Sequence, residues 1–92
     1  MNEKESFEQL VGLLCNITDK EEMRWFLERL LTNAEVDDLT SRLRIYAALA
    51  TSKYTQREIA KLLGVSISKV TRGASNMHSD YTKEFFRKRF PE

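Results

Sequence analysis

Apolar residues recur at the three- and four-residue spacing of helices in six successive segments, and no segment alternates as a strand does. The segments span about residues 3–17, 19–31, 33–50, 56–63, 67–77 and 80–90. Only three glycines and one proline interrupt the chain, and Pro91 closes the last segment. The sequence therefore predicts an all-α fold of six helices, forming a single domain over residues 1–92.

Capping residues separate these segments and set where helices begin. Thr32 with Glu35, and Thr55 with Glu58, have the spacing of a capping box, in which side chain and backbone bond reciprocally. The apolar positions expected on the longest helix are Leu39, Leu43, Tyr46, Ala47 and Leu49. Cys15 lies near the apolar face of the first helix, where we expect a small buried side chain.

Residues 56–71 have the pattern of a helix-turn-helix motif, which we place at about residues 55–77. The positions spaced to form its inner wall are Ile59, Leu63, Val65 and Val70. Ala60 is small where the two helices cross, and Gly64 supplies the left-handed turn. The second helix of this motif enters the major groove and the first crosses the phosphate backbone. The motif assigns Ile67, Ser68, Lys69 and Thr71 to the groove, and Gln56, Arg57 and Lys61 to its rim.

Charge is divided unevenly along the chain. Residues 1–40 carry ten acidic and four basic side chains, whereas residues 41–92 carry eleven basic and four acidic ones. Within residues 41–78, where Arg44 lies, Glu58 is the one acidic residue against seven bases. This distribution favours a polyanion-binding surface that includes Arg44. Charge alone leaves a second interpretation open, a solvated face paired with acidic groups of the chain or of a partner.

Four short runs of residues, together with Gly64, resemble the tryptophan repressor family in residue type, order and spacing. The runs are Leu31-Thr32 followed by Ser41-Arg-Leu-Arg-Ile45, Thr55-Gln-Arg-Glu-Ile59 followed by Gly64, and Val70-Thr-Arg-Gly-Ala-Ser-Asn-Met77. The resemblance covers residues 30–78 and is weaker in the first two helices and the last. It implies an interlocked, all-helical homodimer whose paired short helices project as reading heads towards a near-palindromic DNA operator.

The resemblance also implies L-tryptophan as a corepressor, with its indole between the side chains of Arg42 and Arg72. Guanidinium planes stack on aromatic faces and bind carboxylates, which suits arginine to both positions. By the same resemblance Gly73 lies beside the ligand, and Thr32 caps the helix near backbone carbonyls of the partner subunit that receive the ligand's amino group. A role in phosphate contact alone stays open for both arginines.

Two residues depart from the best-known family members. Asn76 replaces a serine near the ligand carboxylate and can still form hydrogen bonds. Lys69 replaces a small threonine at the edge of the ligand, and three roles are open to it: contact with a DNA phosphate, contact with the ligand carboxylate, or closure of the pocket. Lys69 therefore bears on tryptophan specificity and leaves the DNA-binding prediction unaffected.

Other classes of function receive little support from the sequence. One cysteine and one histidine are too few for an ordinary zinc site, and no nucleophile, base and orienting group suggest catalysis. We expect no metal and no cofactor other than the corepressor ligand, and no catalytic residue. The absence of a long apolar run or signal peptide predicts a cytoplasmic protein without membrane contact.

The leading hypothesis is therefore a dimeric, DNA-binding transcriptional repressor that uses L-tryptophan as corepressor. A second hypothesis is a regulator of the same fold that binds DNA without a ligand or with another amino acid. A third, from a different class, is a helical protein-interaction module whose basic face binds an acidic partner. The combination of Ala60, Gly64, Val65 and Val70 separates the third from the other two, because an interaction module does not need it.

Overall fold

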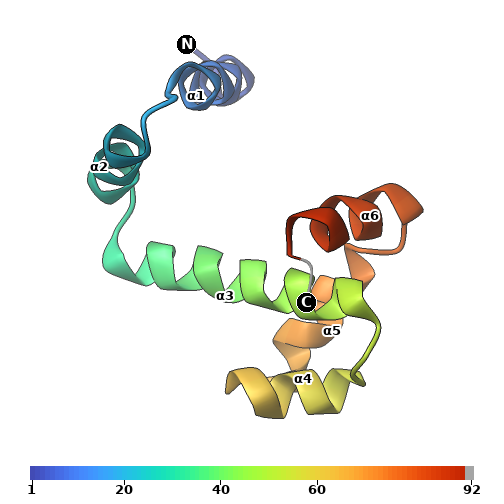
Figure 1. Ribbon diagram of the computed structural model, residues 1–92. Coiled ribbons are helices and arrows are strands. Elements are labelled where there is room, and N and C mark those ends of the chain that lie inside the picture. Colours follow the sequence, from blue (N-terminus) through green and yellow to red (C-terminus); the bar gives the residue numbers. More distant parts are fainter. Residues whose placement is uncertain (91–92) are drawn as a thin grey trace. The chain divides into compact units, whose positions relative to one another are not determined.

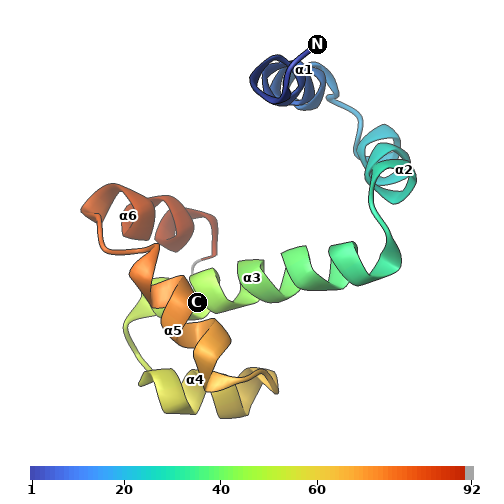
Figure 2. The ribbon, with the colours of Figure 1, turned by 180° about the vertical axis from the view of Figure 1, so that it is seen from behind.

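The computed structural model describes residues 1–90, which form six α-helices and no strand (Figures 1 and 2). The helices are α1 (Glu3–Asn16), α2 (Lys20–Leu30), α3 (Asn33–Thr51), α4 (Gln56–Leu63), α5 (Ile67–Ser75) and α6 (Asp80–Arg89). The prediction of an all-helical chain of six helices is confirmed, with boundaries within a few residues of those expected. The predicted stop at Pro91 lies outside the described residues. The chain divides into two compact units, Met1–Val36 and Asp37–Glu92.

Side-chain caps explain where the helices begin. The backbone N–H of Thr32 donates to Glu35 Oε1 at 2.8 Å, and that of Glu35 donates to Thr32 Oγ1 at 3.1 Å. Thr55 and Glu58 make the same reciprocal pair at the start of α4, at 2.8 and 3.2 Å. Both predicted capping boxes are therefore confirmed, and each satisfies backbone donors that have no partner inside the helix.

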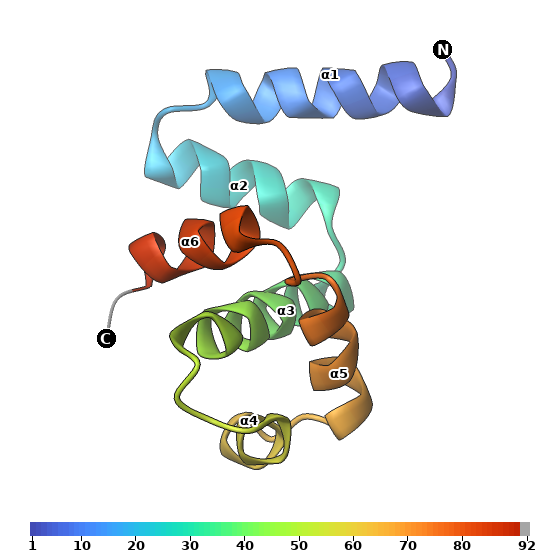
Figure 3. The ribbon, with the colours of Figure 1, turned by 90° about the vertical axis from the view of Figure 1, so that its right-hand side faces the viewer.

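The second unit holds a small apolar core beneath the C-terminal half of α3. In Figures 1 and 3, α4 lies on one side of α3 and α6 on the other, while α5 runs beside α3. Ile45, Ile59 and Val70 are fully buried at its centre. The side chains packed around them are Ala48, Leu49, Ala60, Leu63 and Val65. The predicted inner wall of α4 and α5 is thus confirmed.

The turn between α4 and α5 depends on Gly64. This residue has φ 68° and ψ 35°, the left-handed conformation that a residue with a Cβ adopts only at a steric cost. The backbone N–H of Val65 then donates to the carbonyl of Ala60 at 3.1 Å and closes the end of α4. The predicted role of Gly64 as the residue that ends α4 is confirmed.

The face of α3 that packs on the core agrees with the predicted one only towards the C-terminal end, where Leu49 lies against the core. Leu39 and Leu43, expected on the apolar face, are 47% and 42% exposed, whereas Ile45 and Ala50 are buried. The difference arises because α4 and α5 cover the side of α3 that carries Ile45. Apolar residues lie on more than one side of α3, so the helical period alone did not select the buried side.

The first unit consists of α1, α2 and the first turn of α3, and none of its residues is buried. Large apolar side chains are at least half exposed on both helices: Phe7, Leu13, Trp25 and Leu30. Cys15 is also exposed, so the expectation of a buried cysteine is wrong for the single chain. The amphipathic pattern correctly predicted the helices α1 and α2. Within this unit, however, the apolar sides of both helices stay exposed.

Candidate functional site

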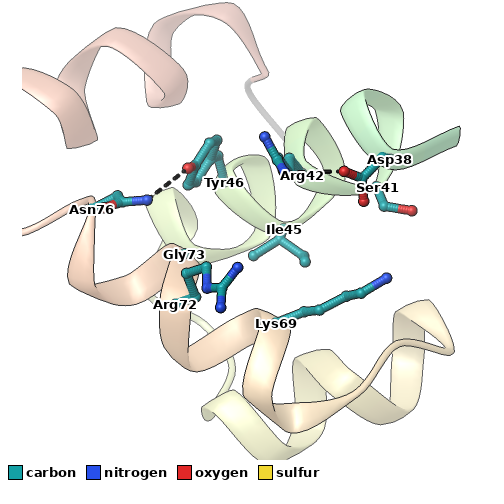
Figure 4. A pocket seen from close by; sticks show the side chains of 9 residues that line it. All are labelled: Asp38, Ser41, Arg42, Ile45, Tyr46, Lys69, Arg72, Gly73 and Asn76. Carbon is teal, nitrogen blue, oxygen red and sulfur yellow. Dashed lines mark hydrogen bonds and ion pairs between the residues drawn. The ribbon is translucent and has the colours of Figure 1, made fainter. Parts of the chain in front are cut away.

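A cavity of about 220 Å³ lies between α3 and α5 in the second unit. It is lined by Asp38, Ser41, Arg42, Ile45 and Tyr46 from α3, and by Lys69, Arg72, Gly73 and Asn76 from the α5 segment (Figure 4). Pockets for drug-sized ligands run to roughly 300–1,000 Å³, so this cavity suits a smaller molecule of about amino-acid size.

Helical spacing brings these residues together. Asp38, Arg42 and Ile45 follow one another at intervals of four and three residues, which places them on one side of α3. On the other wall Lys69, Arg72 and Asn76 lie at intervals of three and four residues, and Asn76 is the residue that ends α5. Each wall of the cavity is therefore a single helical face.

Gly73 sets how closely the two walls approach. A Cβ atom at this position would lie 2.8 Å from Ile45 Cγ2 and 3.4 Å from Leu49 Cδ1. Since real Cβ atoms do not come so close to other carbons, any larger residue would push α5 away from α3. Gly73 therefore has two roles: it allows α5 to pack closely on α3, and it lines the cavity.

The charged groups of the cavity are arranged asymmetrically. On α3, Arg42 Nη2 donates to Asp38 Oδ2 at 3.0 Å, and both side chains remain about half exposed. On α5, Lys69 and Arg72 form no ion pair or side-chain hydrogen bond within residues 1–90. Asn76 Nδ2 donates to the hydroxyl of Tyr46 at 3.3 Å and links the two walls, as Figure 4 shows. The cavity thus presents two unpaired cations opposite a carboxylate already paired with an arginine.

The structure brings most of the predicted ligand-binding residues to this one cavity. Arg42, Arg72, Gly73 and Asn76 all line it, as does Lys69. Thr32 is not among the lining residues; it caps α3 in the first unit. What each residue binds stays a prediction.

Sequence reasoning did not select four of the lining residues, namely Asp38, Ser41, Ile45 and Tyr46. A usable signal was present for all four of them. Asp38, Ile45 and Tyr46 lie four before, three after and four after Arg42, so they share its helical face. Ser41 directly precedes Arg42 and shares this face through Asp38 and Ile45, from which it lies three and four residues away.

The second candidate surface is the exposed side of α4 and α5. All eight residues predicted to bind DNA are exposed: Arg44, Gln56, Arg57, Lys61, Ile67, Ser68, Lys69 and Thr71. Thr71 Oγ1 donates to Gln56 Oε1 at 2.9 Å and ties the start of α4 to the middle of α5. Arg44 Nη2 donates to the carbonyl of Leu63 at 3.4 Å, at the C-terminal end of α4. Arg44 therefore also supports the position of α4, a role the sequence did not predict.

This pair of helices is positively charged. Between residues 56 and 75 the chain carries four basic side chains and one acidic one, Glu58, whose carboxylate is engaged in the cap of α4. Exposed bases of one sign attract a polyanion, and exposed hydroxyl and amide groups can hydrogen-bond to it.

Two further observations concern metal ligands and membrane-spanning helices. Within residues 1–90, no group of three histidine, cysteine, aspartate or glutamate side chains could hold a metal ion. None of the described helices is long and apolar enough to cross a membrane.

Comparison with known proteins identifies the family. The family model described as "Trp repressor protein" matches residues 5–88 of the chain. A Trp operon repressor homolog of Xylella fastidiosa (strain M23) is 43% identical over 89 residues, covering 97% of each chain. A homolog of the same description from Chlamydia trachomatis serovar L2 is 39% identical over 90 residues, covering 95% of this chain and 96% of the relative.

A more distant Trp operon repressor homolog, from Vibrio campbellii, is 32% identical over 77 residues, covering 84% of this chain and 77% of the relative. No solved structure matches the chain significantly. The family match over residues 5–88 includes all six helices in whole or in part, so the resemblance seen in residues 30–78 extends into the first two helices and the last. The chain belongs to the Trp repressor protein family, a family of transcriptional regulators.

Proposed function

We propose that the protein is a dimeric, DNA-binding transcriptional repressor that uses L-tryptophan as its corepressor. In this proposal α4 and α5 form a helix-turn-helix motif, and α5 is the recognition helix that enters the major groove. The observation that carries the proposal is the double position of α5. One side of α5 lines the cavity through Arg72 and Gly73, and another exposes the residues of the candidate groove surface.

This double position supplies a physical route from ligand to DNA. A ligand held between α3 and α5 contacts both helices, because each wall of its site is the face of one helix. Contact with both helices fixes the orientation of α5 relative to α3. The ligand can shift the population of α5 orientations only by its difference in affinity for them, so coupling of about 1–3 kcal/mol is the reasonable scale. A corepressor acting in this way strengthens DNA binding without touching a base.

The chemistry of the cavity suits an aromatic amino acid. Arg42 and Arg72 come from opposite walls and provide planar faces for an indole. The α5 wall, with Lys69, Arg72 and Asn76, also provides donors for a carboxylate. The Trp operon repressor homologs support this choice through their names. Thr32 is proposed to serve the same site from the partner subunit of a homodimer.

The proposal also covers the number of domains, the location and the assembly of the protein. The chain acts as one DNA-binding domain in the cytoplasm and carries out no catalysis. Two copies read a near-palindromic operator, because one recognition helix contacts too few bases to specify a site.

One observation favours a second candidate, a regulator of the same family that binds DNA without tryptophan. Lys69 lines the cavity where the best-known members carry a small threonine, and its side chain is long enough to occupy part of the space. In this case Lys69 substitutes for the ligand and holds α5 permanently in the binding orientation.

A selection from random DNA duplexes, performed with and without L-tryptophan, tests both candidates. The proposal expects one near-palindromic sequence to be enriched, at least five- to tenfold more strongly with tryptophan present. Equal enrichment in both arms supports the ligand-independent regulator. Failure to enrich any sequence in either arm contradicts DNA binding itself.

A further inference from the structure

We propose that Asp38 is a specificity-determining residue that accepts the ammonium group of a zwitterionic α-amino acid bound in the cavity. The inference rests on the proposed function, since it concerns the ligand of the same site. To the backbone carbonyls of the partner subunit, which the resemblance implies for the amino end of the ligand, it adds a charged side chain of this chain.

Asp38 lies on the α3 wall of the cavity and keeps part of its carboxylate available. It is the one acidic side chain among the nine residues that line the cavity, all of which are described. Its Oδ2 atom accepts from Arg42 at 3.0 Å, while its side chain is 49% exposed. A carboxylate has lone pairs for about four donors, so this contact leaves capacity for an ammonium group.

The opposite wall of the cavity, formed by α5, is positively charged. Lys69 and Arg72 lie on α5, line the same cavity and form no ion pair or side-chain hydrogen bond with the rest of residues 1–90. Figure 4 shows their side chains extending below α3, with Asp38 and Arg42 on the helix above. The cavity thus has unpaired positive charge at one wall and a carboxylate at the other.

This layout matches a molecule with both charges close together. In an α-amino acid the ammonium and carboxylate groups are attached to the same carbon, so they can address the two walls at once. The ammonium donates to Asp38, and the carboxylate is bound by Lys69 and Arg72. A ligand with a carboxylate but no ammonium leaves its negative charge near Asp38 uncompensated, which weakens binding.

The inference predicts how the protein distinguishes L-tryptophan from indole-3-propionate, which lacks only the ammonium group. Calorimetric titrations of both ligands measure the ratio of their dissociation constants in the parent and in Asp38→Asn. The asparagine keeps the size of the side chain and an acceptor for Arg42, and removes the charge. We expect the parent to favour L-tryptophan, and Asp38→Asn to reduce the preference about five- to tenfold, mainly by weaker binding of L-tryptophan.

Asp37→Asn is the matched control, because it removes the same charge from the neighbouring exposed position of α3, outside the cavity lining. It should keep the parent's preference. An equal preference in the parent, Asp38→Asn and Asp37→Asn overturns the inference while leaving the corepressor proposal intact. Absence of binding by either ligand to the parent overturns the proposed function, and the inference with it.

Discussion

Among single residues, Gly73 has the tightest surroundings, because it lies both at the crossing of α3 and α5 and at the cavity. An alanine there gains helix propensity of roughly 0.5–1 kcal/mol. Its Cβ also meets Ile45 Cγ2 at 2.8 Å, in a core where Ile45 is only 1% exposed. Overpacking of this kind costs about 1–3 kcal/mol, so the clash outweighs the gain.

Gly73→Ala should therefore lower the melting temperature by several degrees, as measured by circular dichroism. Gly12→Ala is the control, because a Cβ on Gly12 of α1 meets nothing within 4 Å. The control should match or exceed the parent in stability. A Gly73→Ala protein as stable as the parent would show that α5 does not approach α3 as closely as described.

Lys69 decides between the two candidate functions at the ligand site. Because its ammonium group has no partner among the described residues and lines the cavity, we expect it to bind the ligand carboxylate. Lys69→Thr should then weaken L-tryptophan binding severalfold in a calorimetric titration. Lys61→Thr, which removes an exposed charge of α4 away from the cavity, should leave ligand affinity unchanged. Tighter binding by Lys69→Thr would instead mean that the lysine obstructs the pocket.

Among the elements, the sequence predicted where each helix begins and ends better than it predicted which sides of the helices pack together. Caps such as Thr32 and Thr55 and the turn at Gly64 act over three or four residues, so they can be recognised in the sequence alone. The α4–α5 pair was also recognised because its inner wall lies within twelve residues, from Ile59 to Val70. By contrast, which side of α3 faces the core depends on where α4 and α5 pack.

The same distinction explains the site. Arg42, Arg72 and Gly73 were found through a resemblance that matches residue types at fixed spacing. Asp38 was not predicted as a site residue, because a charged residue in a helix is usually only solvated. It nevertheless lies on the same helical face as Arg42. Its pairing with Arg42 and its place in the cavity emerge only when α3 and α5 are folded against each other.

The basic α4–α5 pair also leads to a prediction about ionic strength. If it binds the DNA backbone, affinity for the selected duplex should fall steeply with salt, as counterions released from DNA oppose binding. Arg57→Ala should weaken binding and reduce the slope of log K against log salt by about one. Arg24→Ala, in the first unit, serves as the control of equal charge. Binding that is insensitive to salt would contradict the assignment of this surface.

At the scale of the whole molecule, the exposed apolar residues require an explanation. Phe7 and Trp25 are more than half exposed in the single chain, and α1, α2 and α6 bury no residue within the described part. A 92-residue chain with so small a core is marginal by itself. We expect a homodimer to cover these surfaces.

An obligate homodimer melts at a temperature that rises with protein concentration, because dissociation accompanies unfolding. Thermal melts over a hundredfold range of concentration, together with sedimentation equilibrium, measure both properties. The expected result is a dimeric mass and a concentration-dependent melting temperature. A monomeric mass with a constant melting temperature would contradict the dimer and leave the first unit without a partner.

We expect the cavity between α3 and α5 to bind L-tryptophan. Calorimetric titration of L-tryptophan into the parent and into Arg72→Ala tests it most directly, because it needs no operator and reports stoichiometry. We expect one ligand per chain for the parent and at least tenfold weaker binding for Arg72→Ala, which loses one planar face and one carboxylate donor. No binding heat with the parent, or equal binding by both proteins, would contradict the claim.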